Sequence, residues 1–187
     1  TPKRGSVPNS VRVAVELSPD SESRRYGGVS AGTTGGSWMS MKMDMPRIRA
    51  RSIDRPRLLE IMQPDGIRPA LVLLYGHAGI GKSTLLSQWA DAVALERGEA
   101  LQWLTLREDD AGAGPFWKRV ADDLARHALL GRGLSRESLA TLSAGGTPSV
   151  SSPTGTGMLT LVLDDYHLVA GPHIDAQLAH LLKETPT

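Results

Sequence analysis

Cysteine is absent from this chain of 187 residues. Its absence excludes a disulfide framework, a thiolate nucleophile and a cysteine-ligated zinc site. Long hydrophobic runs are also missing, because the longest, residues 71–75, is far shorter than the roughly 18 residues that a membrane helix needs. The amino-terminal residues lack the apolar stretch of a secretory signal. These absences predict a cytoplasmic protein that does not contact a membrane.

Charge of one sign is not in excess either. The chain has 21 Lys and Arg residues against 20 Asp and Glu residues, for a formal net charge of +1. The totals therefore give no indication of a basic surface for nucleic acid. With 40% hydrophobic residues, a chain of this length can hold one core rather than two.

The first part of the chain differs in composition from the rest. Residues 27–37 are rich in Gly, Ser and Thr, and they cannot bury enough apolar surface to offset the entropy of ordering them. Val11, Val13 and Val15 alternate as in a strand, but nothing nearby in the sequence would pair with it. We therefore expect residues 1–45 to form a disordered tail and residues 46–187 to form a partial folded domain.

From residue 46 onward, apolar runs alternate with helical periodicity. Segments rich in apolar residues predict three strands, over 71–75, 101–106 and 159–163. The first is a continuous apolar run, so we expect it to be buried on both faces. Apolar side chains at helical spacing predict helices over 57–62, from about 82 to 98, from Pro115 to Gly131, over 135–142 and over 174–182. Such alternation predicts a P-loop NTPase fold of the three-layer α/β/α class with a mainly parallel sheet.

A phosphate-binding loop follows the first predicted strand. The residues fit the pattern G-x-x-x-x-G-K-[ST] at every fixed position, and they are Gly76, His77, Ala78, Gly79, Ile80, Gly81, Lys82 and Ser83, with Thr84 next. Glycines allow the backbone N–H groups to point inward around phosphate oxygens, and the following helix adds the positive end of its dipole. We expect Lys82 to reach the β- and γ-phosphates and the Ser83 hydroxyl to coordinate Mg²⁺. A glycine-rich turn that merely contains Lys is the alternative, but a strand before the loop and a helix after it favour nucleotide binding.

Two carboxylates end the last predicted strand. In P-loop enzymes an acid at this position helps to hold Mg²⁺, and an adjacent acid can orient or activate the attacking water. We assign Asp164 to the metal and Asp165 to the water. Other charged residues are interpreted as structural. The run 107–110 is interpreted as a solvated turn, with the alternative that one of its acids lies near the nucleotide, and His167 as more structural than catalytic. The large aromatic residues are assigned to packing, namely Trp89, Trp103, Phe116 and Trp117.

Three blocks of sequence resemble one known family. They resemble the ATPase domain of the MalT-like, LuxR-type transcription regulators, which are STAND/AAA-like P-loop NTPases. The blocks are residues 85–90 after the phosphate loop, residues 103–117, and Asp164-Asp165-Tyr166-His167-Leu168. The segment that contains Arg55 is similar to the part of that family that lies near the adenine. The resemblance covers roughly residues 50–187.

The resemblance implies a switch domain. In that family bound ATP favours an oligomeric, DNA-competent state, and hydrolysis resets it. It implies ATP and Mg²⁺ as cofactors, ADP as product, self-association in the full-length protein, and DNA binding only through a carboxyl-terminal helix-turn-helix that this sequence does not contain.

The chain departs from the family after Asp165. The next strand of related folds inserts between the phosphate-loop strand and the acidic strand, and here no strand comes after Asp165, so we expect an incomplete sheet and poor turnover by this fragment. Two alternatives to the switch domain remain open: a stand-alone small P-loop kinase, and a non-catalytic remnant that keeps the motifs without a complete sheet.

Overall fold

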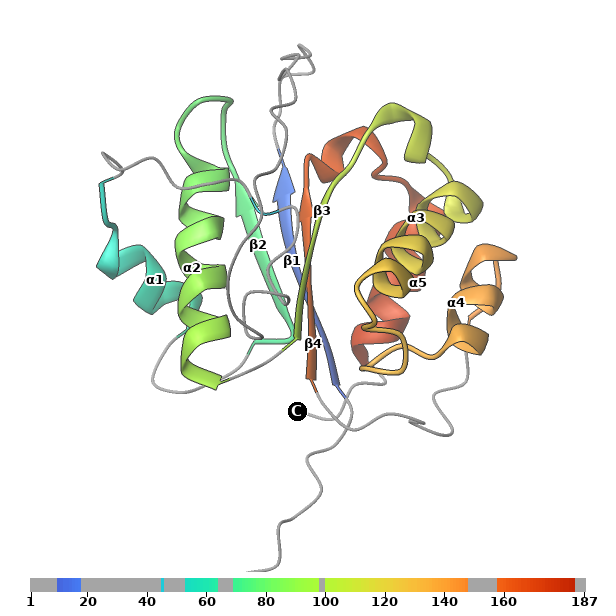
Figure 1. Cartoon of the computed structure of the whole chain (residues 1–187). Coiled ribbons are helices and arrows are strands. Elements are labelled where there is room, and N and C mark those ends of the chain that lie inside the picture. Colours follow the sequence, from blue (N-terminus) through green and yellow to red (C-terminus); the bar gives the residue numbers. More distant parts are fainter. Residues whose placement is uncertain are drawn as a thin grey trace, which may run out of the picture.

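The computed structural model describes residues 10–17, 45, 53–63, 69–97, 100–147 and 158–183. These residues form a three-layer α/β/α structure in which α1 and α2 cover one face of a sheet and α3, α4 and α5 cover the other (Figure 1). The four strands are all parallel, in the order β2-β1-β4-β3. The fold class predicted from the sequence is therefore confirmed. None of the helices in the described ranges is long and apolar enough to cross a membrane.

The elements lie close to their predicted positions. The strands are β1 (Ser10–Leu17), β2 (Leu71–Tyr75), β3 (Ala100–Thr105) and β4 (Met158–Asp164). The helices are α1 (Pro56–Met62), α2 (Lys82–Arg97), α3 (Ala113–Arg126), α4 (Arg136–Ser143) and α5 (Pro172–Lys183), with single 3-10 turns η3 (Glu108–Asp110) and η4 (Tyr166–Leu168). Ser135 caps α4 as expected, because its side chain accepts a hydrogen bond from the Ser138 backbone N–H.

Strand β1 corrects the interpretation of the amino-terminal region. It lies in the middle of the sheet, where Val13 pairs with Leu71 of β2 on one side and with Leu161 of β4 on the other. The expectations that nothing would pair with the alternating valines, and that residues 10–17 belong to a disordered tail, were wrong. Both partners are far away in the sequence, so no local pattern could indicate them. The rest of the expected tail, apart from Met45, lies outside the described residues.

The position of β1 also bears on the expected gap in the sheet. The place between the phosphate-loop strand β2 and the acidic strand β4 was expected to be empty, and β1 occupies it. Val13, Ala14 and Val15 are 1%, 0% and 4% exposed, so this strand is as deeply buried as the rest of the core. The backbone groups of β2 and β4 that face this place therefore have ladder partners.

Two hydrophobic clusters lie on opposite faces of the sheet. Val13, Val15 and Leu161 face the helices α3, α4 and α5, whereas Ala14 and Val162 face α1 and α2. This division follows from the period-two alternation of side chains along a strand. The four large aromatic residues assigned to packing are all buried, which confirms that assignment: Trp89, Trp103, Phe116 and Trp117.

A buried glutamine connects the three helices on one face. The Trp117 indole N–H of α3 donates to Gln177 Oε1 of α5 at 2.8 Å. The Gln177 amide nitrogen donates to the carbonyl oxygens of Leu142 at 3.0 Å and Gly146 at 2.9 Å, at the end of α4. One buried side chain therefore bonds three polar groups, which belong to α3, to α4 and to the residues that follow α4.

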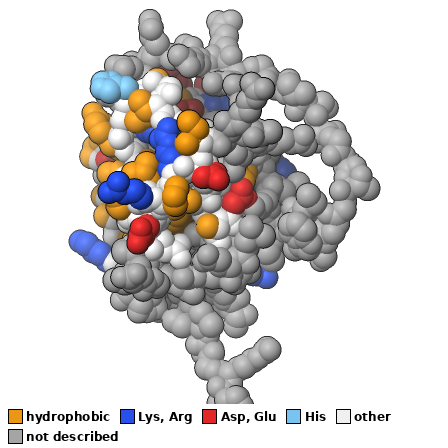
Figure 2. Space-filling view, turned by 90° about the vertical axis from the view of Figure 1, so that its left-hand side faces the viewer, with side chains coloured by type: hydrophobic (Ala, Val, Ile, Leu, Met, Phe, Trp, Pro, Cys, Tyr) orange, Lys and Arg blue, Asp and Glu red, His pale blue; other side chains and the backbone are white. Residues whose placement is uncertain are grey.

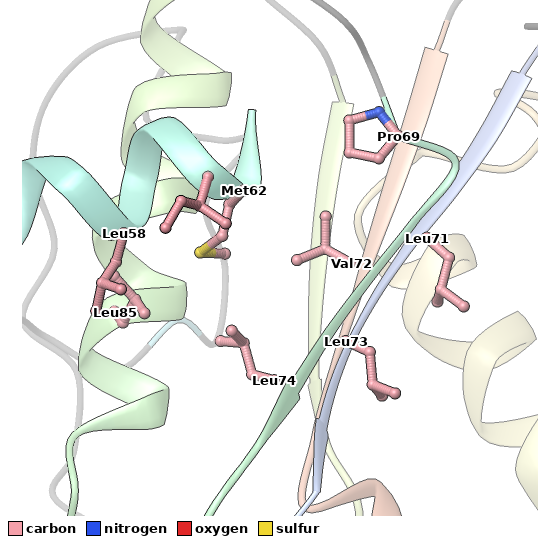
Figure 3. A pocket seen from close by; sticks show the side chains of 9 residues that line it. Leu58, Met62, Pro69, Leu71, Val72, Leu73, Leu74 and Leu85 are labelled. Carbon is pink, nitrogen blue, oxygen red and sulfur yellow. The ribbon is translucent and has the colours of Figure 1, made fainter. Parts of the chain in front are cut away.

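Strand β2 lies at the edge of the described sheet and is buried on one face only. Val72 and Leu74 point toward α1 and α2, whereas Leu71 and Leu73 point to the other side of the strand (Figure 3). Leu71, Leu73 and Tyr75 are 46%, 54% and 70% exposed. The expectation of burial on both faces was wrong, because no described helix covers this side of β2. An apolar cavity of about 360 Å³ lies beside α1. On that side of the molecule, exposed hydrophobic side chains lie among charged ones (Figure 2).

Candidate nucleotide-binding site

The phosphate loop connects the carboxyl end of β2 to the first residue of α2. Gly79 and Gly81 have φ angles of +83° and +88°, a backbone region that L side chains rarely adopt. A Cβ atom on Gly76 would lie 2.4 Å from the Ile80 side chain, so the first glycine allows the loop to close on itself. Helix α2 begins at Lys82, as the sequence predicted. The loop therefore has the backbone shape and the helix start that anion binding at a helix N-terminus requires.

The two polar side chains at the start of α2 point into the molecule. Lys82 is only 7% exposed, and its Nζ donates to the backbone carbonyl of His77 at 3.0 Å. The Ser83 hydroxyl lies between the ends of the central strands. The other predicted loop residues, His77, Ala78 and Ile80, are exposed, as is Thr84. Only Lys82 and Ser83 of this loop thus present their side chains toward the carboxylates of the sheet.

Arg55 lies against the phosphate loop. Its guanidinium Nη2 donates to the Ile80 carbonyl at 3.0 Å, and a Cβ atom on Gly81 would lie 3.1 Å from the same nitrogen. The segment before Arg55 is held to α2 by Gln88, whose amide nitrogen donates to the Ile53 carbonyl at 3.2 Å. The structure therefore brings together Arg55 and the loop, which are 25 positions apart in the sequence.

The two acids of the last strand differ in their surroundings. Asp164 ends β4 and is 6% exposed, with its Oδ1 at 3.3 Å from the Ser83 Oγ. Asp165 is half-buried and adopts a left-handed conformation, with φ 58° and ψ 34°, at the start of η4. A left-handed backbone is uncommon for residues other than glycine. The turn separates the two side chains, so that Asp164 contacts the phosphate-loop serine and Asp165 lies beside it.

Glu16 is a site residue that the sequence analysis missed. It is the seventh residue of β1, is 5% exposed, and its Oε2 accepts a hydrogen bond from the Ser83 hydroxyl at 2.7 Å. Its Oε1 lies 3.5 Å from Lys82 Nζ. A signal was present, because alternating valines followed by an acid resemble the apolar run that precedes Asp164. The signal went unused because residues 10–17 were assigned to the tail.

Three carboxylates converge at the carboxyl ends of β1 and β4. Glu16, Asp164 and Asp165 each contribute an oxygen atom, and these atoms all lie within 4.8 Å of one another. Burial raises the pKa of Asp164 to about 9. A hydrogen bond that protonated Asp164 donates to Glu16 and repulsion from Glu16 and Asp165 add to the rise, while the bond that Ser83 donates opposes it. Burial and the charge of Glu16 also raise the pKa of Asp165, against the attraction of His167 and Lys82. The three carboxylates therefore favour binding of a proton or of another cation.

The donor set fits a magnesium ion. Every candidate ligand in this cluster is a carboxylate or hydroxyl oxygen, which is the ligand type that Mg²⁺ prefers. Burial is the main cause of the raised Asp164 pKa, and the carboxylates of Glu16 and Asp165 add to it; a divalent cation would favour the ionised form of Asp164 against both effects. Ser83 and Asp164, the predicted metal ligands, are among these donors.

The acidic run after β3 is not part of this cluster. Arg107, Glu108 and Asp109 are exposed, and the backbone N–H of Arg107 donates to the Asp110 carboxylate at 3.0 Å. The run closes the turn η3 at the start of the connection to α3. The interpretation of residues 107–110 as a solvated turn is confirmed.

Comparisons with known proteins find distant relatives. The chain is 28% identical over 144 residues to the serine/threonine-protein kinase PknK of Mycobacterium tuberculosis, covering 70% of this chain and 12% of that protein. It is 24% identical over 155 residues to the HTH-type transcriptional regulator MalT of Vibrio parahaemolyticus, covering 80% of this chain and 16% of that protein. It is 27% identical over 121 residues to the molybdenum-pterin-binding protein MopB of Rhodobacter capsulatus, covering 64% of this chain and 44% of that protein.

These similarities support a loose relationship to MalT-like proteins. The chain spans less than half the length of each of these relatives. No family model and no solved structure matches it. The relationship is therefore one of distant sequence similarity, together with an α/β fold of the P-loop type.

Proposed function

We propose that the chain is the ATP-binding switch domain of a LuxR-type, MalT-like transcription regulator, and that the complete protein hydrolyses ATP. The proposal rests on one observation: Lys82, Ser83 and Asp164 lie close together at one end of the sheet. Lys82 and Ser83 begin α2 directly after the phosphate loop, and the Ser83 hydroxyl lies 3.3 Å from the Asp164 carboxylate. The distant similarity to MalT supports the class of protein.

Each side chain has a role in this proposal. The loop N–H groups and Lys82 bind the β- and γ-phosphates, and Arg55 fixes the loop from the side of α1. Ser83 and Asp164 hold Mg²⁺, which when bound neutralises charge on the phosphates. Asp165 orients the attacking water and accepts its proton as the water oxygen bonds to the γ-phosphorus. The bond between the γ-phosphorus and the bridging oxygen breaks, and ADP and phosphate leave. The raised pKa of Asp165 suits a general base, because it moves the group toward neutral pH.

The structure weakens the alternative of a non-catalytic remnant, and the sequence does not support the alternative of a small P-loop kinase. The remnant alternative depends on an empty position at the centre of the sheet, and β1 fills that position. A small P-loop kinase would need an arginine-rich lid over the nucleotide, and the sequence shows none in its loops. The similarity to a protein kinase does not change this, since protein kinases use a G-x-G-x-x-G loop and a lysine on a later strand, whereas Lys82 begins a helix.

Thermal unfolding of the chain with and without Mg-ATP tests the proposal. ATP at about 100 times its Kd should stabilise the fold by about 2.7 kcal/mol, which raises Tm by roughly 5–10 °C for a domain of this size. Lys82→Ala should remove most of that shift. The matched control is Lys118→Ala, which changes an exposed lysine of α3 that pairs with Asp122 and should keep the shift. Equal shifts in the wild type and in Lys82→Ala would refute the role of Lys82.

A further inference from the structure

Glu16 occupies the centre of the proposed nucleotide site, although it comes from a segment about 60 residues before the phosphate loop. Its carboxylate contacts both side chains that the loop directs inward, Ser83 and Lys82. We propose that Glu16 is a third protein ligand of the magnesium ion, beside Ser83 and Asp164. The inference rests on the proposed function, because it concerns the metal of the same site.

The spacing of the oxygen atoms carries the proposal. Mg²⁺ binds six oxygen ligands at 2.0–2.1 Å in octahedral geometry, so neighbouring ligands lie about 3.0 Å apart and opposite ones about 4.2 Å apart. The Ser83 hydroxyl lies 2.7 Å from a Glu16 oxygen and 3.3 Å from an Asp164 oxygen. One of these distances is slightly shorter and the other slightly longer than the separation of neighbouring ligands. One ion can therefore contact Ser83, Glu16 and Asp164 after small side-chain adjustments.

Burial and charge support the same assignment. The side chains of Glu16 and Lys82 are each 6% exposed, so neither can rely on water for solvation. When Glu16, Asp164 and Asp165 are ionised, Lys82 offsets one of three negative charges and leaves two. One divalent cation supplies that charge and allows Lys82 to turn from Glu16 toward a phosphate. A buried acid without such compensation is strongly disfavoured.

A competing account gives the opposite prediction. If Glu16 only takes the place of a phosphate on Lys82 and Ser83, the nucleotide must displace it. Removing its charge would then strengthen ATP binding, and it would do so whether or not magnesium is present. The two accounts are distinguished by how the effect of a Glu16 variant depends on the metal.

The experiment measures binding rather than turnover. Calorimetry gives the Kd of ATP for the whole chain in excess Mg²⁺ and in EDTA, and electron paramagnetic resonance gives the Kd of Mn²⁺ for the chain saturated with ATP. We expect Glu16→Gln to weaken Mn²⁺ binding and Mg-dependent ATP binding at least about tenfold, since even outer partners of metal ligands contribute 10–100-fold. ATP binding in EDTA should change less than about twofold. Glu137→Gln, on an exposed position of α4, is the matched control and should match the wild type.

The outcomes separate this inference from the proposed function. If Glu16→Gln changes the Kd of ATP equally in Mg²⁺ and in EDTA, or strengthens both, Glu16 is not a metal ligand and the nucleotide site stands. If the wild type binds ATP in neither condition, the proposed function itself is wrong. Circular dichroism shows whether Glu16→Gln is folded. If it is not, Glu16→Asp, which keeps the charge and moves the carboxylate back by one methylene, should weaken Mn²⁺ binding several-fold, and unchanged Mn²⁺ binding would overturn the proposal.

Discussion

The raised pKa of Asp164 makes the stability of the fold depend on pH in an unusual direction. Most carboxylates in folded proteins have lowered pKa values and stabilise the fold as pH rises. The pKa of Asp164 is raised from 3.8 to about 9, so the folded state holds a proton that the unfolded state releases. The contribution of Asp164 is therefore fully present below about pH 4 and is lost as pH rises toward 9.

The magnitude follows from linkage. One proton held only by the folded state lowers the free energy of unfolding by about 1.4 kcal/mol per pH unit. Between pH 5 and pH 8, inside the window from 3.8 to about 9, the loss is about 4 kcal/mol. Such a loss is large against the 5–15 kcal/mol that stabilise a typical domain.

Urea unfolding at pH 5, 6, 7 and 8 in EDTA measures this loss. Asp164→Asn removes the titrating group, so the variant should gain stability relative to the wild type by about 1.4 kcal/mol for each unit of rising pH. Asp122→Asn, which changes an exposed acid of α3, is the control and should follow the wild type. Parallel pH profiles for the wild type and Asp164→Asn would refute the reasoning, because they would mean that Asp164 is ionised throughout this range.

Three further substitutions test the packing. Ala14→Asp puts a charge at a fully buried position of β1, and urea unfolding should show a loss of more than about 4 kcal/mol. Unaltered urea unfolding would mean that these residues belong to a disordered tail. Gln177→Leu leaves the buried Trp117 indole N–H unpaired, whereas the Leu142 carbonyl keeps the bond from the Gly145 backbone N–H, so the free energy of unfolding should fall by about 1–3 kcal/mol. A change below about 0.5 kcal/mol by the same assay would contradict the role of this hydrogen-bonded side chain. Leu73→Lys changes an apolar side chain on the exposed face of an edge strand and should reduce aggregation, measured by light scattering, with Tm nearly unchanged; unchanged scattering would show that this face does not drive aggregation.

The elements that the sequence predicted well are those with local signals. The phosphate loop is a contiguous motif between a strand and a helix, and Lys82 begins α2 where the motif places it. Asp164 ends a continuous apolar run, and Ser135 caps a helix that begins at the next residue. In each case the residues that determine the geometry lie within a few positions of one another.

The features that the sequence analysis missed depend on distant partners. Strand β1 has a plain alternation of valines, but its stability comes from pairing with β2 and β4, which lie beyond the reach of local patterns. Glu16 was missed with the strand that carries it. The exposure of Leu73 on β2 also depends on sheet order, because a continuous apolar run looks alike at an edge and in the centre.

The central place of β1 couples the proposed ligand site to the core. Glu16 contacts Ser83 and lies in the same strand as Val13 and Val15, which pack against the helices on the far face. A metal ion that binds Glu16 must therefore stabilise β1 in its place between β2 and β4, and the amides of residues 11–16 should exchange hydrogen more slowly with Mg-ATP than without it. In Glu16→Gln that extra protection should fall while protection of α2, which contacts the phosphates directly, is largely kept. Equal loss of protection in both elements would mean that the nucleotide, and not the metal, connects β1 to the site.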